Sequence, residues 1–406
     1  MIASFIIKIS SLSEEELKKL EQYCHESETR AGIVTEILLY SDEELEVRSP
    51  CKNIQIFIHK DIAIAHRLAV AAASGEWLSF TTIRYLLRDK KQLLPKTAYN
   101  APAKHVLLSN SSKVFFMVIS KIYYADVINS IAQLKDILDN AEQKQYIHHI
   151  KPTVNDFLYE DVQDQFKNIS LSPMNLTWKK DIPVFIICYN RLRPLKELLG
   201  WLSDEGLTNI ILIDNSSTYP PLLKFYQKTK HTVVRLSYIN AGHTVFWSQG
   251  INKLLAYNRP FILTDPDIIP DKNSHGATRH FMNLLNKYGN IVKVGFGLEI
   301  NDLPDHYALK QNVLHWEKQF WEKPVEDGVF SADIDTTFAL YRPNTEYVLG
   351  LALRTGGKYV ARHEPWYIDS TNPGEEILHY QKTANSSSSW GIKQNDRPEY
   401  HIQVDT

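Results

Sequence analysis

Four short apolar runs, each followed by a polar loop, limit what residues 183–270 can fold into. The runs PVFIIC, NIILID, VVRL and PFILT are too short for helices, and their near-continuous apolar character is typical of strands buried on both faces. Between the first two runs, leucines recur at helical spacing (Leu195, Leu198, Leu199 and Leu202) and Gly206 stands where a helix-ending glycine is expected. Strand–helix–strand units of this kind build parallel sheets, so the pattern predicts an α/β fold.

Three of these strands end in loops rich in polar residues. The loops read CYNR, IDNSS and TDPD, and the last one carries Asp265 and Asp267 on either side of Pro266. Because parallel strands bring their carboxyl ends to one edge of a sheet, the three loops are predicted to form a site there. Taken alone, an Asp-Pro-Asp turn is also a common way to cap a strand. Because two other polar loops are predicted on the same edge, a functional role for Asp265 and Asp267 is favoured over a simple turn.

The first half of the chain repeats the same pattern more weakly. FIIKISSLSEEELKKLEQ gives a strand and a capped helix, TEILLYSDEE gives the second strand, and IAHRLAVAAASGEWLSF gives a helix and a further strand. Thr81 and Thr82 stand where the second half has Thr264 and Asp265, so this copy lacks the carboxylate pair. We expect a duplication with a period of roughly 180 residues. The predicted divisions are a degenerate domain at 1–140, a linker at 141–180 and a catalytic domain at 181–406.

Composition excludes several classes of protein. The formal net charge is -2, so no overall positive field points to nucleic acid. No apolar run approaches the ~20 residues that span a bilayer. The three cysteines lie far apart and indicate neither a disulfide framework nor a zinc site. The expected location is therefore the cytoplasm.

The motifs in residues 181–370 resemble glycosyltransferase family 2, which has the GT-A fold. The matching pieces, in order, are PVFIICYNR, ILIDNSS, NAGHTVFWSQGIN and LTDPDI, the last corresponding to the DxD motif of that family. Residues 1–90 resemble it weakly. The resemblance implies two tandem GT-A-like domains whose mostly parallel sheets are flanked by helices. It also implies a metal-dependent enzyme that moves a sugar from a nucleotide diphosphate, with a UDP-sugar expected, to a glycan or glycolipid in surface polysaccharide synthesis.

The resemblance also assigns binding roles to individual residues. Asp265 and Asp267 would hold Mn²⁺ or Mg²⁺, which prefer oxygen ligands, and His363 is a candidate third ligand; packing beside Trp366 is the alternative for His363. The residues expected to bind the nucleotide sugar are Asn190, Arg191, Asp214, Asn240, Gly242, Asp265 and Arg362, the last because it belongs to a basic cluster that could steady the diphosphate. The alternatives are an Asx turn at Asp214, a plain turn at Asn240 and Gly242, and a solvated basic cluster that contains Arg362.

An inverting transferase needs a carboxylate that takes the proton from the acceptor hydroxyl. The candidates are Glu364, Asp335 and Asp369, together with Asp333. Members of the family carry a Glu-Asp pair in this region, whereas this chain has His363-Glu364 and then Asp369. The sequence leaves the choice among these carboxylates open, and each of them could also be a surface charge.

Two other functions are compatible with the same residues. Both halves could form an inactive module that binds a glycan or a nucleotide. A sugar-phosphate nucleotidyltransferase shares the architecture, but that class opens with a glycine-rich loop, and FIICYNRLRP has no glycine. For an enzyme of the resembled family, a peripheral position at the inner face of a membrane is also implied, and no nucleic acid partner is expected.

Overall fold

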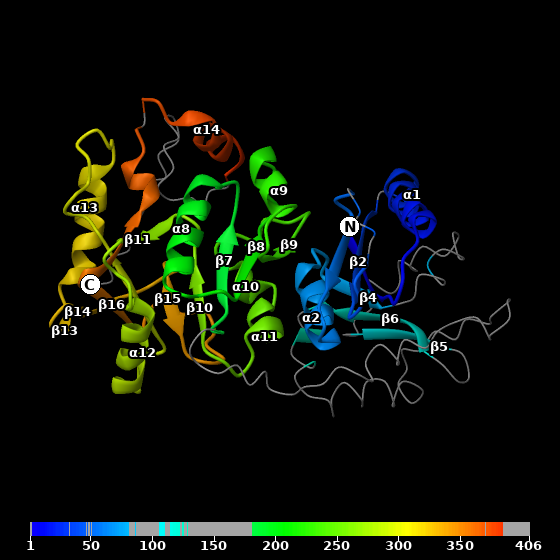
Figure 1. The fold of residues 1–406 in the computed structure, drawn as a ribbon, viewed down its shortest axis with the longest axis horizontal. Helices are drawn as coiled ribbons and strands as arrows, with labels where there is room; N and C mark the ends of the chain where they lie inside the picture. The colour runs from blue at the N-terminus through cyan, green and yellow to red at the C-terminus, as the bar shows by residue number, and fades with distance from the viewer. Residues whose placement is uncertain are drawn as a thin grey trace, which may run out of the picture.

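Both halves of the chain contain strands and helices (Figure 1). The computed structural model describes residues 2–80 except 32, 46, 48 and 50, then 86, 105–109, 114–121, 124, 125, 128, 181–369 and 371–384. The predicted linker at 141–180 and the Thr81–Thr82 pair lie outside these residues. Across the described ranges, no helix combines the length and the apolar character that crossing a bilayer requires.

Six strands and two helices of the first half lie within the described ranges from end to end. They are β1 (Ile2–Lys8), α1 (Glu14–Ala31), β2 (Val34–Ser41), β3 (Ile54–Ile58), α2 (Ile62–Ala72), β4 (Trp77–Phe80), β5 (His105–Ser109) and β6 (Val114–Ser120). Helix α1 begins with a capping box, because Ser13 Oγ accepts from the Glu16 N–H at 3.2 Å and Glu16 Oε2 accepts from the Ser13 N–H at 2.9 Å. This confirms the capped helix expected after the first strand.

The second half begins as predicted and continues with less regular elements. Its first elements are β7 (Val184–Cys188), α8 (Arg193–Asp204), β8 (Ile210–Asp214), α9 (Pro220–Tyr226), β9 (Thr232–Arg235), α10 (Val245–Ser248), α11 (Ile251–Leu255) and β10 (Phe261–Thr264). They are followed by β11 (Ile268–Pro270), α12 (Ala277–Lys287), β12 (Lys293–Leu298), α13 (Lys310–Lys318), β13 (Pro324–Glu326), β14 (Val329–Ser331), β15 (Ala339–Tyr341), β16 (Ala352–His363) and α14 (Gly374–Thr383). Gly206 has φ +82° just beyond α8, as a helix-ending glycine requires.

The two sheets have the same order of strands over six positions. In the first sheet the order is β3-β2-β1-β4-β6-β5, and in the second the corresponding path is β9-β8-β7-β10-β15-β12. In both, the first four strands are parallel and the next two join antiparallel. The predicted α/β fold class is therefore correct, with one mainly parallel sheet and one larger mixed sheet. A duplication would produce this shared order, and the domain bounds stay a prediction.

Each sheet has helices on both faces, because successive side chains of a strand point to opposite sides. In β1, Phe5 and Ile7 pack with α1 residues, whereas Ile6 belongs to the cluster that contains α2. In β7, Phe185 and Ile187 face α10 and α11, and the remaining residues face the cluster of α8 and α12. Strands buried on both faces explain why the apolar runs of the sequence show no alternation.

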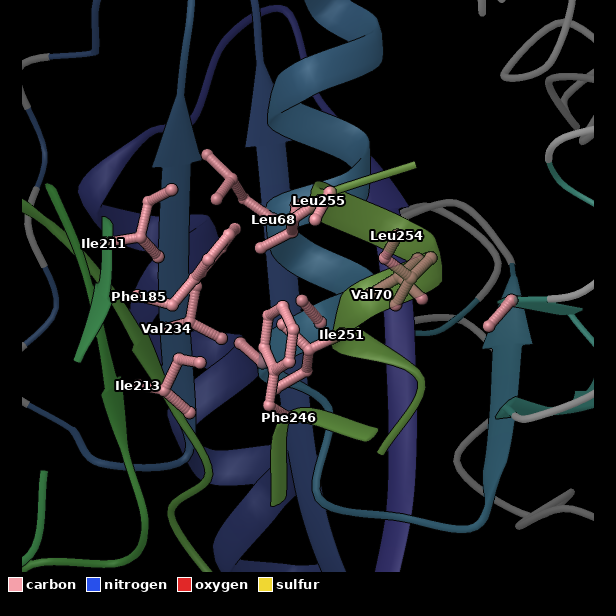
Figure 2. Packing of buried hydrophobic residues seen from close by; sticks show 14 of the residues in the cluster. Leu68, Val70, Phe185, Ile211, Ile213, Val234, Phe246, Ile251, Leu254 and Leu255 are labelled. Atoms are coloured by element: carbon pink, nitrogen blue, oxygen red, sulfur yellow. The ribbon is translucent and has the colours of Figure 1, made fainter. Parts of the chain in front are cut away.

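The halves meet through α2 and α11, which occupy equivalent places before β4 and β10. Figure 2 shows Leu254 and Leu255 of α11 beside Leu68 and Val70 of α2, within one continuous cluster that reaches Phe185. Polar contacts border this cluster: Arg67 Nη1 donates to the Leu254 carbonyl at 2.9 Å, and Gln55 Nε2 donates to the Arg235 carbonyl at 2.9 Å. The two halves therefore share one hydrophobic cluster, and each half has a further cluster of its own among the described residues.

A buried lysine in the first half predicts how stability changes with pH. Lys121 is 1% exposed, and burial lowers its pKa to about 7. The unfolded chain keeps this proton up to a pH of about 10.4, so unfolding takes up a proton between the two values and stability rises with pH there. We expect the free energy of unfolding to rise by at most about 1.4 kcal/mol per pH unit from this group.

Denaturant unfolding of wild type and Lys121→Met at pH 7 and pH 9 measures this effect. Lys121→Met should show the smaller rise from pH 7 to pH 9, because the variant lacks the titrating amine. The exposed residue Lys18 provides the control, because Lys18→Met should keep the wild-type slope. A Lys121→Met protein that is equally destabilised at both pH values would show that Lys121 is charged when folded.

Candidate active site

The parallel part of the second sheet has a topological switch point between β7 and β10. From β7 the chain runs outward through β8 to β9, then returns to add β10 on the other side of β7. In open α/β sheets, ligands bind outside the carboxyl ends of the strands at such a point. The loop from Tyr189 to Leu192 follows β7 here, and the Asp265–Pro266–Asp267 turn follows β10. The topology thus brings two of the three predicted loops together.

Asp267 lies close enough to Asp265 to affect the pKa of the Asp265 carboxyl. Burial and the neighbouring Asp267 carboxylate raise the pKa of Asp265 well above its usual value. Thr336 fixes Asp265 on both sides, since its hydroxyl donates to Oδ2 at 2.6 Å and its carbonyl accepts from the Asp265 N–H at 3.0 Å. Two carboxylates held together in this way favour a positive ligand, because a cation relieves both the repulsion and the desolvation.

His363 lies next to this pair but does not complete a metal site. It sits at the end of β16, paired with Ile268 of β11, and its ring packs edge-on against Trp366 with centroids 4.8 Å apart. Its Nδ1 is buried and has no hydrogen-bond partner, and burial lowers the pKa of the imidazole. Among the described residues, no three His, Cys, Asp or Glu side chains form a group that could hold a metal ion. The aspartates fit a cation that takes its other ligands from a bound diphosphate.

Arg191 connects the two loops of the switch point. Its guanidinium is buried, and Nη2 pairs with Glu364 Oε2, while Nη1 lies 3.7 Å from Asp267 Oδ2. Arg193 pairs with the other oxygen of Glu364. The closest partner of Arg191 is therefore Glu364, with longer ion pairs to Asp267 and to Glu376, whose Oε1 lies 3.8 Å from Nε. Arg191 carries one positive charge into a group of carboxylates and lowers the cost of placing them together.

Helix α14 covers the loop after β7 (Figure 1). Glu376 Oε2 accepts from the N–H groups of Leu192 and Arg193 at 2.9 and 3.0 Å, so it caps the start of α8. Tyr189 Oη donates to the Thr383 carbonyl at 2.6 Å, and Asn190 Nδ2 donates to Thr383 Oγ1 at 2.8 Å. The sequence had given no reason to place this helix at the site.

Asn190 and Asp214, which were predicted to bind nucleotide, bind other parts of the protein in this structure. Asn190 has φ +51°, and its Oδ1 accepts from the N–H groups of Thr218 and Tyr219 at 2.7 and 2.9 Å. Asp214 is fully buried, accepting from Arg235 Nε at 3.0 Å and Tyr226 Oη at 3.2 Å. These side chains shape the loops after β7 and β8.

Asn240, Gly242 and Arg362 occupy different surroundings. Asn240 Oδ1 accepts from the Gly242 N–H at 3.0 Å, and Gly242 has φ +71°, so the two form a tight turn beyond β9. The Gly242 carbonyl accepts from Asn215 at 2.9 Å, which joins this turn to the loop after β8. Arg362 points to the opposite face of β16 from its neighbour His363 and pairs there with Asp302, so the structure does not bring it to the aspartate pair.

The candidate bases differ sharply in their surroundings. Glu364 is 7% exposed and bound to two arginines, and the exposed Asp369 accepts from Thr371 in its own turn. Asp335 is exposed, and its charge contributes to the raised pKa of Asp265, so it lies near the aspartate pair. Asp333 is also exposed and has no such effect on Asp265. Of the candidates, Asp335 best combines access with proximity.

Comparisons with known proteins add little at the level of sequence. No protein-family profile matches the chain, and no curated protein matches it. Among solved structures, a mycobacterial protein shares 12% identity over 45% of this chain and 67% of its own, with a TM-score of 0.24. The glycosyltransferase GlyE of Streptococcus pneumoniae TIGR4 shares 8% identity over 60% of this chain and 82% of its own, with a TM-score of 0.22. The apo form of GlyE shares 8% identity over 62% of this chain and 83% of its own, with a TM-score of 0.20. Because these scores are low, the case for function depends on the site.

Proposed function

We propose that this protein is a glycosyltransferase that moves a sugar from a nucleotide diphosphate, with a UDP-sugar as the expected donor, to a glycan or glycolipid. The observation that carries the proposal is the Asp265–Asp267 pair at the topological switch point between β7 and β10. GT-A-like tandem domains, the family 2 relationship and a place at the inner face of a membrane belong to the same proposal.

Asp265 and Asp267 would hold a divalent cation, Mn²⁺ or Mg²⁺, which when bound would neutralise charge on the diphosphate leaving group. Thr336 keeps Asp265 in place, and the backbone carbonyl of Asp267 accepts from the Glu364 N–H at 2.9 Å, which fixes the turn. Arg191, paired mainly with Glu364, adds a positive charge beside the turn. The turn after β9 at Asn240 and Gly242 would offer backbone groups to the donor.

Asp335 is the proposed base of an inverting reaction. The acceptor oxygen forms a bond to the anomeric carbon while the bond from that carbon to the diphosphate breaks. The bonding electron pair leaves with the diphosphate, and Asp335 takes the proton of the acceptor hydroxyl. The side chain is exposed, as a group that meets an incoming acceptor must be.

Thermal shift with a panel of nucleotide sugars, with and without Mn²⁺, tests donor binding first. We expect one donor to raise the midpoint by several degrees in the presence of Mn²⁺, since ligand at 100 times its Kd stabilises by about 2.7 kcal/mol. Turnover of that labelled donor then separates the enzyme from the alternative of a binding module. A donor that binds but is never hydrolysed or transferred supports a nucleotide-binding module, and no binding of any donor contradicts both the transferase and the nucleotide-binding module.

A further inference from the structure

Asp335 is hydrogen-bonded to Tyr347, and Tyr347 contacts His243. Tyr347 Oη donates to Asp335 Oδ1 at 2.9 Å, and the same oxygen lies 3.3 Å from His243 Nε2. The three residues come from separate segments: the loop before β15, the loop before β16 and the turn after β9. Through Tyr347, these two contacts connect His243, next to the turn that contains Gly242, with the carboxylate of Asp335.

The backbone beneath Tyr347 and Asp335 is held firmly. The buried Lys293 donates to the carbonyls of both Ile334 and Val348, the residues next to Asp335 and Tyr347. The Ile334 N–H donates to the Leu349 carbonyl at 3.0 Å, and Tyr341 Oη donates to the Asp335 carbonyl at 3.1 Å. The two loops therefore keep a fixed spacing.

The ring of Tyr347 is also fixed, although the residue is 37% exposed. It packs on Trp247 with centroids 5.1 Å apart, and Trp247 Nε1 donates to the Thr345 carbonyl at 3.0 Å. Trp247 belongs to α10, four residues beyond His243. One aromatic pair thus holds the hydroxyl of Tyr347 between the imidazole and the carboxylate.

The chemistry of the three groups sets the direction of their hydrogen bonds. Burial and the Asp335 carboxylate raise the pKa of Tyr347, so the phenol keeps its proton. An ionised Asp335 can only accept, so Tyr347 donates to it, and the phenol oxygen then accepts from His243. His243 must carry a proton on Nε2 in this arrangement.

We infer that Tyr347 is a positioning residue that orients the Asp335 carboxylate and, through His243, couples it to the donor-side turn at Asn240–Gly242. This inference deepens the proposed function and depends on it for the role of Asp335. A donor that contacts the turn would change the placement of His243, and the two hydrogen bonds would carry this change to the carboxylate. Tyr347 and His243 are both exposed, so a role in core stability does not account for the alignment of their side chains.

Tyr347→Phe tests the role in catalysis, because it keeps the ring against Trp247 and removes only the hydroxyl. We expect kcat to fall by about tenfold, the usual effect of losing one hydrogen bond to a charged group, with the donor KM changed less than about twofold. Tyr288→Phe is the matched control, since Tyr288 Oη donates to Glu326 at 3.1 Å away from the site. His243→Gln keeps an N–H donor and should retain more activity than His243→Ala. Equal kcat values for Tyr347→Phe and Tyr288→Phe would overturn the inference.

Nitrogen-15 NMR of the histidine rings tests the contacts without any activity. The chain has 15 histidines, and His243→Ala identifies the signal of His243. We expect a protonated Nε2 in the wild type, and a changed Nε2 shift in both Tyr347→Phe and Asp335→Asn but not in Tyr288→Phe. Unchanged His243 shifts in both site variants would overturn the coupling. If the shifts change as expected while no donor is turned over, the coupling stands and the proposed function fails.

Discussion

Replacing Asp267 by alanine should lower the transferase rate by at least about a hundredfold, because preorganised electrostatic groups at a reacting centre typically contribute about 10²–10³ in rate. The Asp267 carboxylate is one of the groups that raise the pKa of Asp265, so the two side chains are close. Without it, a cation would keep one protein carboxylate and lose affinity. The measurement is the rate of transfer or hydrolysis of the donor identified by thermal shift, over a range of Mn²⁺ concentrations.

The loss should not come from unfolding. The Asp267 carboxylate repels the charged form of Asp265 and so helps to raise the pKa of Asp265; Asp267→Asn should therefore leave the thermal midpoint without cation unchanged or slightly higher. The rise of the midpoint with Mn²⁺ and donor should disappear in both variants. Asp305→Asn is the control, because Asp305 is fully exposed and pairs only with Lys310 among the described residues. Full activity of Asp267→Ala would refute the cation-binding role and, with it, the proposed mechanism.

Local sequence patterns were sufficient for the elements that position the aspartate pair. Continuous apolar runs located β7, β8 and β10 to within a residue or two, and Gly206 marked the end of α8. These features depend on residues close together along the chain. The position of Asp265 and Asp267 at a sheet edge followed from them, since parallel strands put their carboxyl ends together.

The partners of the site residues could not be predicted in the same way. Arg191 pairs with Glu364, 173 residues further along, and Asn190 bonds to Thr383 on α14, 193 residues away. The spacing of these residues along the chain does not predict such contacts, because the contacts depend on how β11, β16 and α14 pack onto the sheet. For the same reason Tyr347, which no motif contains, was missed, although it contacts Asp335. Arg362 was predicted to bind the nucleotide because of its charge. In the structure, the alternation of side chains along β16 directs Arg362 to Asp302.

The shared core between the halves also has a large expected effect. Leu254 is 1% exposed, belongs to α11 and lies in the cluster that contains α2 (Figure 2). Leu254→Ala should lower the free energy of unfolding by about 3–5 kcal/mol, the range for a buried leucine that leaves a cavity. Leu285→Ala on α12 is the matched control, since Leu285 is 2% exposed but belongs to the other cluster of the second half.

The two variants should differ in how they unfold rather than in how much stability they lose. Because Leu254 packs between the halves, its loss weakens the contact of α2 with α11. We expect calorimetry to show one transition for the wild type and two for Leu254→Ala. Leu285→Ala should lower the midpoint and keep a single transition, since its cavity lies within the second half alone. Two transitions in the Leu285→Ala protein, or one in the Leu254→Ala protein with an equal loss of stability, would show that the α2–α11 contact does not couple the halves. One wild-type transition that splits in Leu254→Ala alone would support the prediction that the first half, whose sequence lacks the aspartate pair, stabilises the half that carries it.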